Sequence, residues 1–417
     1  MTAAGTPVGS RAEAEALDAA DPLASFRERF LFADPDLIYL DGNSLGMQPK
    51  ATVAAIQETV ERWGRDLILG WRRWVDLPRE VGDLIAEQVL EARTGEVLVS
   101  DSTSVNLYKL AGAAVSARPG RRVIVTDDDN FPTDHYILQG LAAERGMTVR
   151  LVPADPVEGI DAERVAAAIG PDTALVSFSH VAYRSAAVAD MHRITELAHS
   201  VGALMLWDLS HAAGSVPVPL ESSGADLAVG CTYKYLNGGP GSPAFLYVRR
   251  DLAALRSPIW GWFGHRDQYA MTSTYEPAEG VERFLVGAPS VLSLVGIEQG
   301  ARLIGEAGID RLRTKGIALT ELIIRLADAW LVPLGFAVVS PRRPERRGSH
   351  VSLRHPEAKN VVRALIREAN VITDHRPPDR VRLAPAPLTT RFVDVWDAMD
   401  RLRRLPVVDR DGPAPAS

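Results

Sequence analysis

The chain has 417 residues, 46% of them hydrophobic and 24% charged, a composition typical of a globular protein with two or three domains. Its net charge is −7, from 46 Lys and Arg against 53 Asp and Glu, and it carries no basic stripe, which argues against nucleic acid or an anionic membrane as main partner. A single cysteine, Cys231, excludes a disulfide framework and any cysteine-based zinc or iron–sulfur site.

Targeting, membrane and metal signals are missing from the sequence. The first residues lack the basic-then-apolar pattern of a secretion signal, and no apolar run reaches the 18 residues of a membrane span. The nine histidines form no His-Glu-x-x-His or similar pair. We therefore expect a cytoplasmic protein without a metal site. The two ends, residues 1–10 and 408–417, are small, polar and rich in Pro and Gly, and we expect them to be unstructured.

Between residues 95 and 250, short apolar runs typical of buried strands alternate with helical patterns. The predicted strands are Glu96–Ser100, Arg122–Thr126, Thr148–Val152, Thr173–Ser179, Ala203–Trp207, Asp226–Val229 and Ala244–Val248. The predicted helices are Ser104–Ser116, Thr133–Arg145, Asp161–Ile169 and Met191–Val201. The alternation predicts an α/β fold with a mainly parallel sheet flanked by helices, whose ligands bind beyond the carboxyl ends of the strands.

After Ser290 the pattern changes to separate helices and strands, which predicts a smaller α+β domain. The predicted elements are helices Val291–Gly305, Ile309–Leu334, Lys359–Ala369 and Val393–Leu405, and strands Ala337–Val339, His350–Arg354 and Val381–Ala384. The arginine-rich stretch Pro341–Gly348 is interpreted as a solvated loop. We predict an N-terminal segment (1–48) that packs with the small domain, a large domain (49–308), a small C-terminal domain (309–407) and a disordered tail (408–417).

Three nucleotide and hydrolase motifs are missing: G-x-G-x-x-G after the first strand, the P-loop and G-x-S-x-G. Instead, Asp208 and His211 follow one predicted strand, and Lys234 follows the next, before a glycine-rich turn. This arrangement suits a pyridoxal phosphate enzyme, in which a lysine forms a Schiff base and a carboxylate pairs with the pyridinium nitrogen. The alternative is a surface lysine and a helix-capping aspartate.

Two further loops follow predicted strands. Asp101–Ser104 opens a helix, where hydroxyls and free N–H groups bind phosphate well, although a plain helix cap explains them equally. Asn130–Asp134 contains Phe131, whose ring could stack on a planar cofactor or belong to the core.

Seven segments together resemble the kynureninases, pyridoxal phosphate enzymes of fold type I in the class V aminotransferase group. They are YLDGNSLG (39–46), DSTSVNLYK (101–109), NFPTD (130–134), DLSHAAG (208–214), YKYLNGGPG (233–241), GWFGH (261–265) and VRLAPAPL (381–388). The motifs extend over about residues 36–405 in the family's order.

The resemblance implies a role for each matching residue. Lys234 matches the Schiff-base lysine, Asp208 the partner of the ring nitrogen, and Tyr233 an assisting acid that also contacts the phosphate. The remaining cofactor positions are matched by Ser102, Thr103, Phe131, Thr133, Asp134, Ser179 and His211, and by Trp262 and Ala288 in stretches that a second subunit supplies. Arg382 matches the arginine that grips the substrate α-carboxylate, and Asn43, Ser44 and Trp71 match the substrate side.

The implied activity is hydrolysis of the Cβ–Cγ bond of L-kynurenine or 3-hydroxy-L-kynurenine to anthranilate or 3-hydroxyanthranilate and L-alanine, through cofactor-bound aldimine and ketimine forms. The implied context is a cytoplasmic homodimer with shared active sites, in tryptophan catabolism, the kynurenine pathway and NAD biosynthesis.

Four departures from the family pattern concern the substrate side. Gly287 and Ala288 replace the side chains that donate a hydrogen bond in animal and bacterial members. The Gly70–Trp74 segment is about two residues shorter than in bacterial members, and the animal aryl-site histidine has no counterpart. Ala182 and Ala186 replace Asn and Gly. These departures leave open a related hydrolase or lyase acting on a modified kynurenine or another γ-keto amino acid.

Two other functions compete with this interpretation. A cysteine desulfurase needs a mobile nucleophilic cysteine, but Cys231 falls on a predicted buried strand. A homologue that binds the cofactor without turnover would not need Lys234, Asp208 and Arg382 together.

Overall fold

The computed structural model describes residues 9–406. The ends predicted to be unstructured lie outside this range except for Gly9 and Ser10. For Ser10 the prediction is wrong, because its hydroxyl caps the first helix by accepting from the backbone N–H of Glu13. Among the described residues, no helix combines the length and the apolar character needed to cross a membrane.

The helices and strands are numbered in chain order. The helices are α1 (Arg11–Ala19), α2 (Lys50–Asp66), α3 (Trp71–Trp74), α4 (Leu77–Gln88), α5 (Thr103–Ser116), α6 (Pro132–Arg145), α7 (Ala162–Ala168), α8 (Met191–Ser200), α9 (Leu220–Ser223), α10 (Val291–Ala307), α11 (Ile309–Leu326), α12 (Ala358–Glu368) and α13 (Phe392–Arg403). The strands are β1 (Ile38–Tyr39), β2 (Val97–Val99), β3 (Val123–Asp127), β4 (Thr148–Val152), β5 (Thr173–Ser179), β6 (Leu204–Asp208), β7 (Leu227–Gly230), β8 (Phe245–Val248), β9 (Ala337–Val338), β10 (Val351–Arg354), β11 (Val371–Ile372), β12 (Asp374–Arg376) and β13 (Arg380–Leu383).

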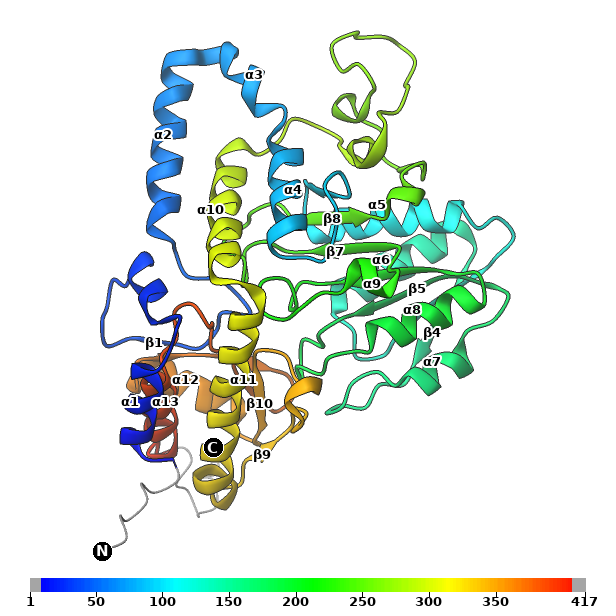
Figure 1. Ribbon diagram of the computed structural model, residues 1–417. Helices are drawn as coiled ribbons and strands as arrows, with labels where there is room; N and C mark the ends of the chain where they lie inside the picture. Colours follow the sequence, from blue (N-terminus) through cyan, green and yellow to red (C-terminus); the bar gives the residue numbers. More distant parts are fainter. Residues whose placement is uncertain (1–8, 407–417) are drawn as a thin grey trace, which may run out of the picture.

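The main sheet has the strand order β2-β8-β7-β6-β5-β3-β4, in which β8 alone runs antiparallel to its neighbours. Each of its seven strands was predicted from the sequence, with bounds within one residue. Helices lie on both sides of the sheet (Figure 1). The predicted α/β class is therefore confirmed.

Apart from the edge strand β4, both faces of the main sheet are buried, so alternate residues of one strand enter different hydrophobic clusters. Ile124 of β3 packs in a cluster with Leu107 of α5. The next residue, Val125, packs in the opposite cluster with Ile194 of α8. A strand buried on both faces reads as a continuous apolar run, which is why these strands were recognisable in the sequence.

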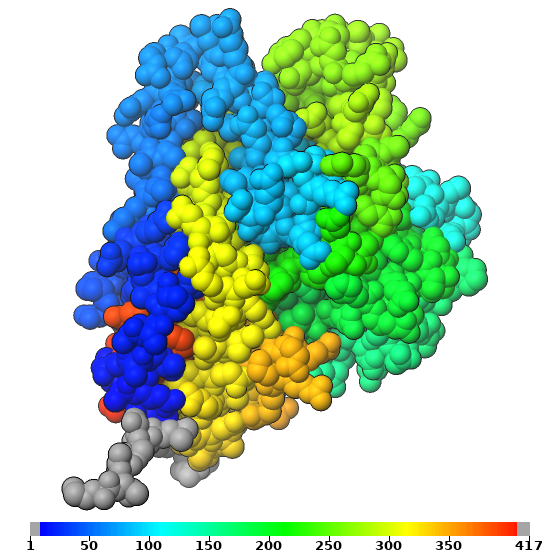
Figure 2. All heavy atoms as spheres, in the orientation of Figure 1, coloured from blue at the N-terminus to red at the C-terminus, as the bar shows by residue number. Residues whose placement is uncertain are grey.

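The helices α2 and α4, which were not predicted, pack beside α10 (Figure 1). The end of α2 through α3 forms one protrusion of the molecule, and the chain between β8 and α10 forms a second, with a hollow between them (Figure 2).

The C-terminal part contains an antiparallel sheet of order β12-β13-β10-β9, packed with α11, α12 and α13. The parallel pair β1–β11 joins residues 38–39 to this part of the chain. The predicted helix Ile309–Leu334 is shorter than expected: α11 ends at Leu326 and continues as a π-helical turn and a 3₁₀ turn. Pro333, which lacks a backbone N–H, lies in the last turn.

The arginine-rich stretch Pro341–Gly348 is not simply a solvated loop. The side chain of Arg347 is fully buried, where it pairs with Glu321 and donates to the backbone carbonyls of Pro341 and Arg342. The prediction was wrong for this residue because folding brings the carboxylate of Glu321, 26 residues away in the chain, next to its guanidinium group.

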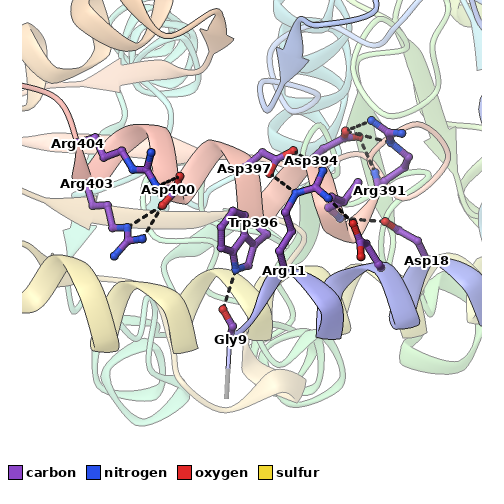
Figure 3. A network of polar contacts seen from close by, with 12 residues as sticks. Gly9, Arg11, Asp18, Arg391, Asp394, Trp396, Asp397, Asp400, Arg403 and Arg404 are labelled. Atoms are coloured by element: carbon purple, nitrogen blue, oxygen red, sulfur yellow. Dashed lines mark hydrogen bonds and ion pairs between the residues drawn. The ribbon is translucent and has the colours of Figure 1, made fainter. Parts of the chain in front are cut away.

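A polar network fastens the N-terminal helix α1 to α13 (Figure 3). Asp18 accepts from the backbone N–H groups of Phe392 and Val393, at 2.6 and 3.0 Å, in the first turn of α13. Arg11 pairs with Asp397, and the indole N–H of Trp396 donates to the carbonyl of Gly9 at 2.7 Å. A carboxylate at a helix N-terminus satisfies free N–H groups and interacts favourably with the helix dipole.

Replacing Asp18 with alanine should therefore destabilise the fold by about 1–2 kcal/mol, because two N–H groups of α13 lose their acceptor. Thermal unfolding followed by circular dichroism should show a midpoint a few degrees below that of the unmodified chain. Glu28→Ala, at an exposed position in the same N-terminal segment, should leave the midpoint unchanged and serves as the control. Equal midpoints for Asp18→Ala and the control would contradict this role of Asp18.

Candidate active site

A cavity of about 770 Å³ lies where the main sheet meets the N-terminal loop and β12. Its walls come from chain segments that directly follow strands: Ser100–Ser104 after β2, Phe131 to Asp134 after β3, and Tyr233–Lys234 after β7. Asp208, the last residue of β6, also lines this central cavity. The site thus lies at the carboxyl ends of the parallel strands, as the fold predicts.

The structure brings ten of the sixteen predicted site residues to the wall of the central cavity. They are Ser44, Ser102, Thr103, Phe131, Thr133, Asp134, Asp208, Tyr233, Lys234 and Ala288. The other six, Asn43, Trp71, Ser179, His211, Trp262 and Arg382, do not line it.

Two of these six lie directly behind the wall. His211 places Nε2 3.3 Å from the Nζ of Lys234. Ser179 donates to Oδ1 of Asn130 at 2.8 Å, and the same oxygen accepts from the backbone N–H of Phe131. Ser179 therefore contacts the loop that carries Phe131.

The two tryptophans lie away from the cavity. Trp71 packs edge-on against Trp74 and contacts Phe263, with ring centroids 5.8 and 6.2 Å apart. Trp262 is 45% exposed and packs against the same Phe263. Within one chain, neither indole reaches the residues around Lys234.

Lys234 owes its position to the pairing of β6 and β7. These strands are parallel neighbours, with Asp208 opposite Val229, and Lys234 follows the end of β7 by four residues. Its Nζ lies 6.0 Å from the ring centroid of Phe131. The ammonium and the aromatic face thus border the same space.

The N-terminal loop is held against the lysine loop by a close backbone contact. The N–H of Gly46 donates to the carbonyl of Tyr233 at 2.7 Å. A Cβ atom at Gly46 would lie 2.3 Å from the carbonyl oxygen of Lys234, so no other residue fits there without a shift. This contact brings Ser44 to the cavity.

Three buried acids lie close together: Asp134 and Asp208, which line the cavity, and Asp127 behind them. Burial raises the pKa of Asp127 to about 7. Burial, together with the neighbouring Asp208 and Asp127, raises the pKa of Asp134 well above its ordinary value. Oδ2 of Asp134 has no hydrogen-bond partner among residues 9–406. A buried group of carboxylates favours a cationic ligand.

The start of α5, in contrast to the buried acids, favours an anionic ligand. The hydroxyl of Ser102 caps this helix by accepting from the N–H of Val105 at 3.3 Å, which leaves other N–H groups of the first turn available. Ser102, Thr103 and Ser104 all line the cavity there. Hydroxyls and N–H groups at a helix start favour a phosphate group.

Lys109 of α5, which was not singled out from the sequence, holds the loop that carries Asp101 in place. Its fully buried Nζ donates to the carboxylate of Asp101 and to the carbonyl of Phe284, both at 2.7 Å. Asp101 has a φ of 50°, rare for a residue with a side chain. No sequence signal distinguishes such a lysine from an exposed helical one.

Arg382 is buried rather than exposed to the cavity. Its guanidinium forms a two-pronged pair with Asp374 and also donates to Ser44 and to the carbonyl of Tyr183. Arg376, another residue not singled out from the sequence, lines the cavity instead. Asn43 is also buried, and both polar atoms of its amide lack partners within the described chain.

The comparisons with known proteins agree with one another. Residues 312–402 match the family model of the kynureninase C-terminal domain, and residues 102–241 match that of the Cys/Met metabolism PLP-dependent enzymes. A kynureninase from Pseudomonas fluorescens is 45% identical over 403 residues, which cover 94% of each chain. A second, from Burkholderia pseudomallei, is 44% identical over 406 residues, covering 94% of this chain and 95% of that one.

The chain belongs to the kynureninase family. Solved structures of lower identity share its fold. A cysteine desulfurase from Thermococcus onnurineus matches with a TM-score of 0.76 at 20% identity, covering 88% of this chain and 94% of its own. The cystine C–S lyase C-DES matches with a TM-score of 0.78 at 19% identity, covering 89% of this chain and 97% of its own.

Pyridoxal phosphate is the cofactor of this enzyme, and the residues of the central cavity fit it. The buried acids, with the unpartnered oxygen of Asp134, provide the negative environment that a protonated ring nitrogen needs. Lys234 borders the same space, and the hydroxyls at the start of α5 suit the phosphate.

The raised pKa of Asp127 predicts a pH dependence of stability for the cofactor-free chain. Between about pH 4 and 7 the folded chain keeps a proton that the unfolded chain has released, so stability falls as the pH rises through this range. Asp127→Asn, which is neutral at every pH, should be more stable than the unmodified chain at pH 8, by at most about 4 kcal/mol, and this gain should vanish near pH 4.

Urea unfolding of both chains at pH 4, 6 and 8 measures this difference. Asp128→Asn provides the control, because Asp128 is exposed. A stability difference for Asp127→Asn that does not change with pH would contradict the assignment.

Proposed function

We propose that the protein hydrolyses the Cβ–Cγ bond of L-kynurenine, or of its 3-hydroxy derivative, to anthranilate or 3-hydroxyanthranilate and L-alanine. The observation that carries this proposal is that Lys234, Asp208, Phe131 and the start of α5 border one cavity, in a chain about 45% identical to kynureninases over nearly its whole length. Bound pyridoxal phosphate supplies an electron sink for the charge released at the substrate's α-carbon.

Lys234 is proposed to hold the cofactor covalently through its amine and then to carry protons to and from the substrate. His211 supports this role, because Nε2 lies 3.3 Å from Nζ. Burial and the nearby charge of Lys234 lower the pKa of His211 far below its ordinary value, so the imidazole stays neutral and can share a hydrogen bond with the amine without taking its proton.

Tyr233 is proposed as an assisting acid. Burial raises the pKa of its phenol to about 12, so the hydroxyl keeps its proton at neutral pH and can donate a hydrogen bond into the cavity. Asp208 is proposed to face the ring nitrogen. Ser102, Thr103, Thr133, Asp134 and Phe131 are proposed as further contacts of the cofactor, with Ser179 acting through Asn130.

A desulfurase function is disfavoured by the only cysteine. Cys231 is buried, its thiol donates toward the carbonyl of Ser210, and burial raises its pKa. A thiol held protonated on a packed segment does not act as a mobile nucleophile.

The second candidate is cleavage of a modified kynurenine or another γ-keto amino acid. One part of the cavity wall favours this second candidate, because Gly287 and Ala288 present no polar side chain there. Parallel assays with L-kynurenine and 3-hydroxy-L-kynurenine, scored by the anthranilate product and by alanine, separate the candidates. Absence of both products from the cofactor-loaded enzyme would leave only the second.

We also propose a homodimer that shares its active sites, in the cytoplasm and in tryptophan catabolism. Exposed apolar side chains support an interface: Leu67, Ile68 and Leu69 on one protrusion, and Trp260, Trp262, Tyr269 and Met271 on the other. Exposed apolar side chains gathered on neighbouring positions mark protein contacts.

We propose that the chain is divided as the sequence predicts, into an N-terminal segment (1–48), a large domain (49–308) and a small C-terminal domain (309–407). A separate hydrophobic cluster formed by Ala14, Ile38, Leu40 and residues from Leu319 to Leu405 supports a small domain joined by the N-terminal segment.

Lys234→Ala should lose covalent attachment of the cofactor and at least about 1,000-fold in activity, because both the anchor and the proton carrier are removed. After borohydride reduction, mass spectrometry should find the cofactor on the peptide that contains Lys234 in the unmodified enzyme, and on no peptide of the variant. Lys359→Ala, at an exposed position of α12, is the control. Cofactor found on another lysine of the unmodified enzyme would refute the assignment.

Shared active sites predict complementation between two inactive variants. If Trp262 serves the partner's site, an equimolar mixture of Lys234→Ala and Trp262→Ala subunits should recover up to about a quarter of the unmodified activity, since half of the dimers are hybrids with one complete site. Unfolding and refolding the two chains together forms the hybrids, and each variant refolded alone is the control. No recovery, with hybrid dimers demonstrated by mass spectrometry, would exclude this sharing.

A further inference from the structure

His350 is a fully buried histidine that packs beside His211, next to the central cavity. It directly precedes β10 in the small sheet. Neither of its ring nitrogens has a hydrogen-bond partner among residues 9–406. Because leaving a buried polar group without a partner costs free energy, an imidazole placed in this way calls for a functional explanation.

Hydrogen bonds fasten the chain next to His350 to the loops after β6 and β7. The hydroxyl of Tyr235, which follows β7, donates to the carbonyl of Ser349 at 3.3 Å. The hydroxyl of Ser349 donates to the carbonyl of Ser215 at 3.4 Å, and the hydroxyl of Ser215 donates to the carbonyl of His211 at 3.1 Å. These bonds give His350 a defined position relative to both loops.

The ring of His350 lies beside the histidine that contacts the lysine. The ring centroids of His350 and His211 are 5.9 Å apart, with an angle of 55° between their planes. Nε2 of His211 lies 3.3 Å from Nζ of Lys234. No hydrogen bond joins the two rings directly within residues 9–406, but one water molecule between their nitrogens would give each ring a partner.

Burial lowers the pKa of both rings well below the ordinary value of histidine, so both imidazoles are neutral. The positive charges of Lys234 and Arg382 act in the same direction. The charged and titratable side chains close to the two rings or to Lys234 are Asp134 and Cys231 from the segments after β3 and β7, and Arg376 and Arg382 from β12 and β13. A neutral imidazole has one donor and one acceptor nitrogen, so Nε2 of His211 accepts from the lysine only while Nδ1 carries the ring proton.

We propose that His350 is a positioning residue for Lys234. Linked to His211 through one bound water, it keeps the ring proton of His211 on Nδ1, so that Nε2 accepts a hydrogen bond from the nitrogen of Lys234. The inference rests on the proposed function, because it takes Lys234 as the residue that holds the cofactor. It adds to the site a residue of the small sheet that acts through His211.

The test follows the visible absorbance of the bound cofactor against pH in the holoenzyme. This absorbance changes when the nitrogen that joins the cofactor to Lys234 loses its proton. In His350→Leu the protonated nitrogen loses its fixed acceptor, so the midpoint pH should fall by about one unit, or about tenfold in proton affinity. The amide of His350→Gln supplies a donor and an acceptor, so its midpoint should stay within about 0.3 units of that of the unmodified enzyme.

His355→Leu is the matched control. His355 is a second buried histidine, directly after β10, and its ring stacks on Phe336 with the centroids 4.3 Å apart. Removing this ring should leave the midpoint unchanged. A shift of equal size in His355→Leu or in His350→Gln would show that lost packing is the cause, and it would overturn the inference. A His350→Leu midpoint equal to that of the unmodified enzyme would overturn it as well.

Two measurements keep this inference separate from the proposed reaction. The titration needs bound cofactor but no substrate, so it decides the role of His350 even if no anthranilate forms, which would overturn the proposed reaction alone. Borohydride reduction and mass spectrometry of His350→Leu should still find the cofactor on Lys234, because His350 does not hold it. Cofactor found on a different lysine in the unmodified enzyme would overturn both proposals.

Discussion

Two neighbouring parallel strands, β6 and β7, end at the same edge of the main sheet, and the site depends on this geometry. Asp208 ends one strand, and the chain after the other carries Lys234. Parallel strands with crossover helices bring all their carboxyl ends to one side, so the loops after β2 and β3 reach the same cavity. β6 and β7 are buried on both faces of the sheet, which makes this edge a rigid support for groups that must stay aligned.

Two groups of charged side chains lie at or just behind the wall of the cavity. In the first, Asp127, Asp134 and Asp208 are buried together, and their environment favours a cation such as a protonated cofactor ring. In the second, Arg376 and Arg382 share the carboxylate of Asp374, and Asp41 lies close to both arginines. Holding like charges close together destabilises the ligand-free protein to some degree, but it keeps the site prearranged for its ligands.

The two tryptophans predicted for the site, unlike the residues around Lys234, do not line the central cavity. Trp71 and Trp262 pack against Phe263 and lie away from Lys234 of the same chain. Trp71 was expected on the substrate side of this site, whereas Trp262 was expected to serve the site of a second subunit. They lie toward the two protrusions that carry exposed apolar side chains. The proposed second subunit would cover these exposed apolar surfaces.

The local sequence determined the strands, the helices after them and the position of Asp208 and Lys234 next to strand ends. These features depend on hydrophobic periodicity and on the order of elements along the chain, both of which are local. Only the tertiary structure decided that Arg347 is buried, that Lys109 supports the loop before α5, and that Arg376 rather than Arg382 borders the cavity. Each of these three depends on partners brought close by folding. Arg347 reaches Glu321, Lys109 reaches Phe284, and the register of β12 on β13 sets Asp374 against Arg382. The environment of a long charged side chain is fixed by such non-local contacts, because its flexible stem lets the same residue type lie in solvent or in a buried pair.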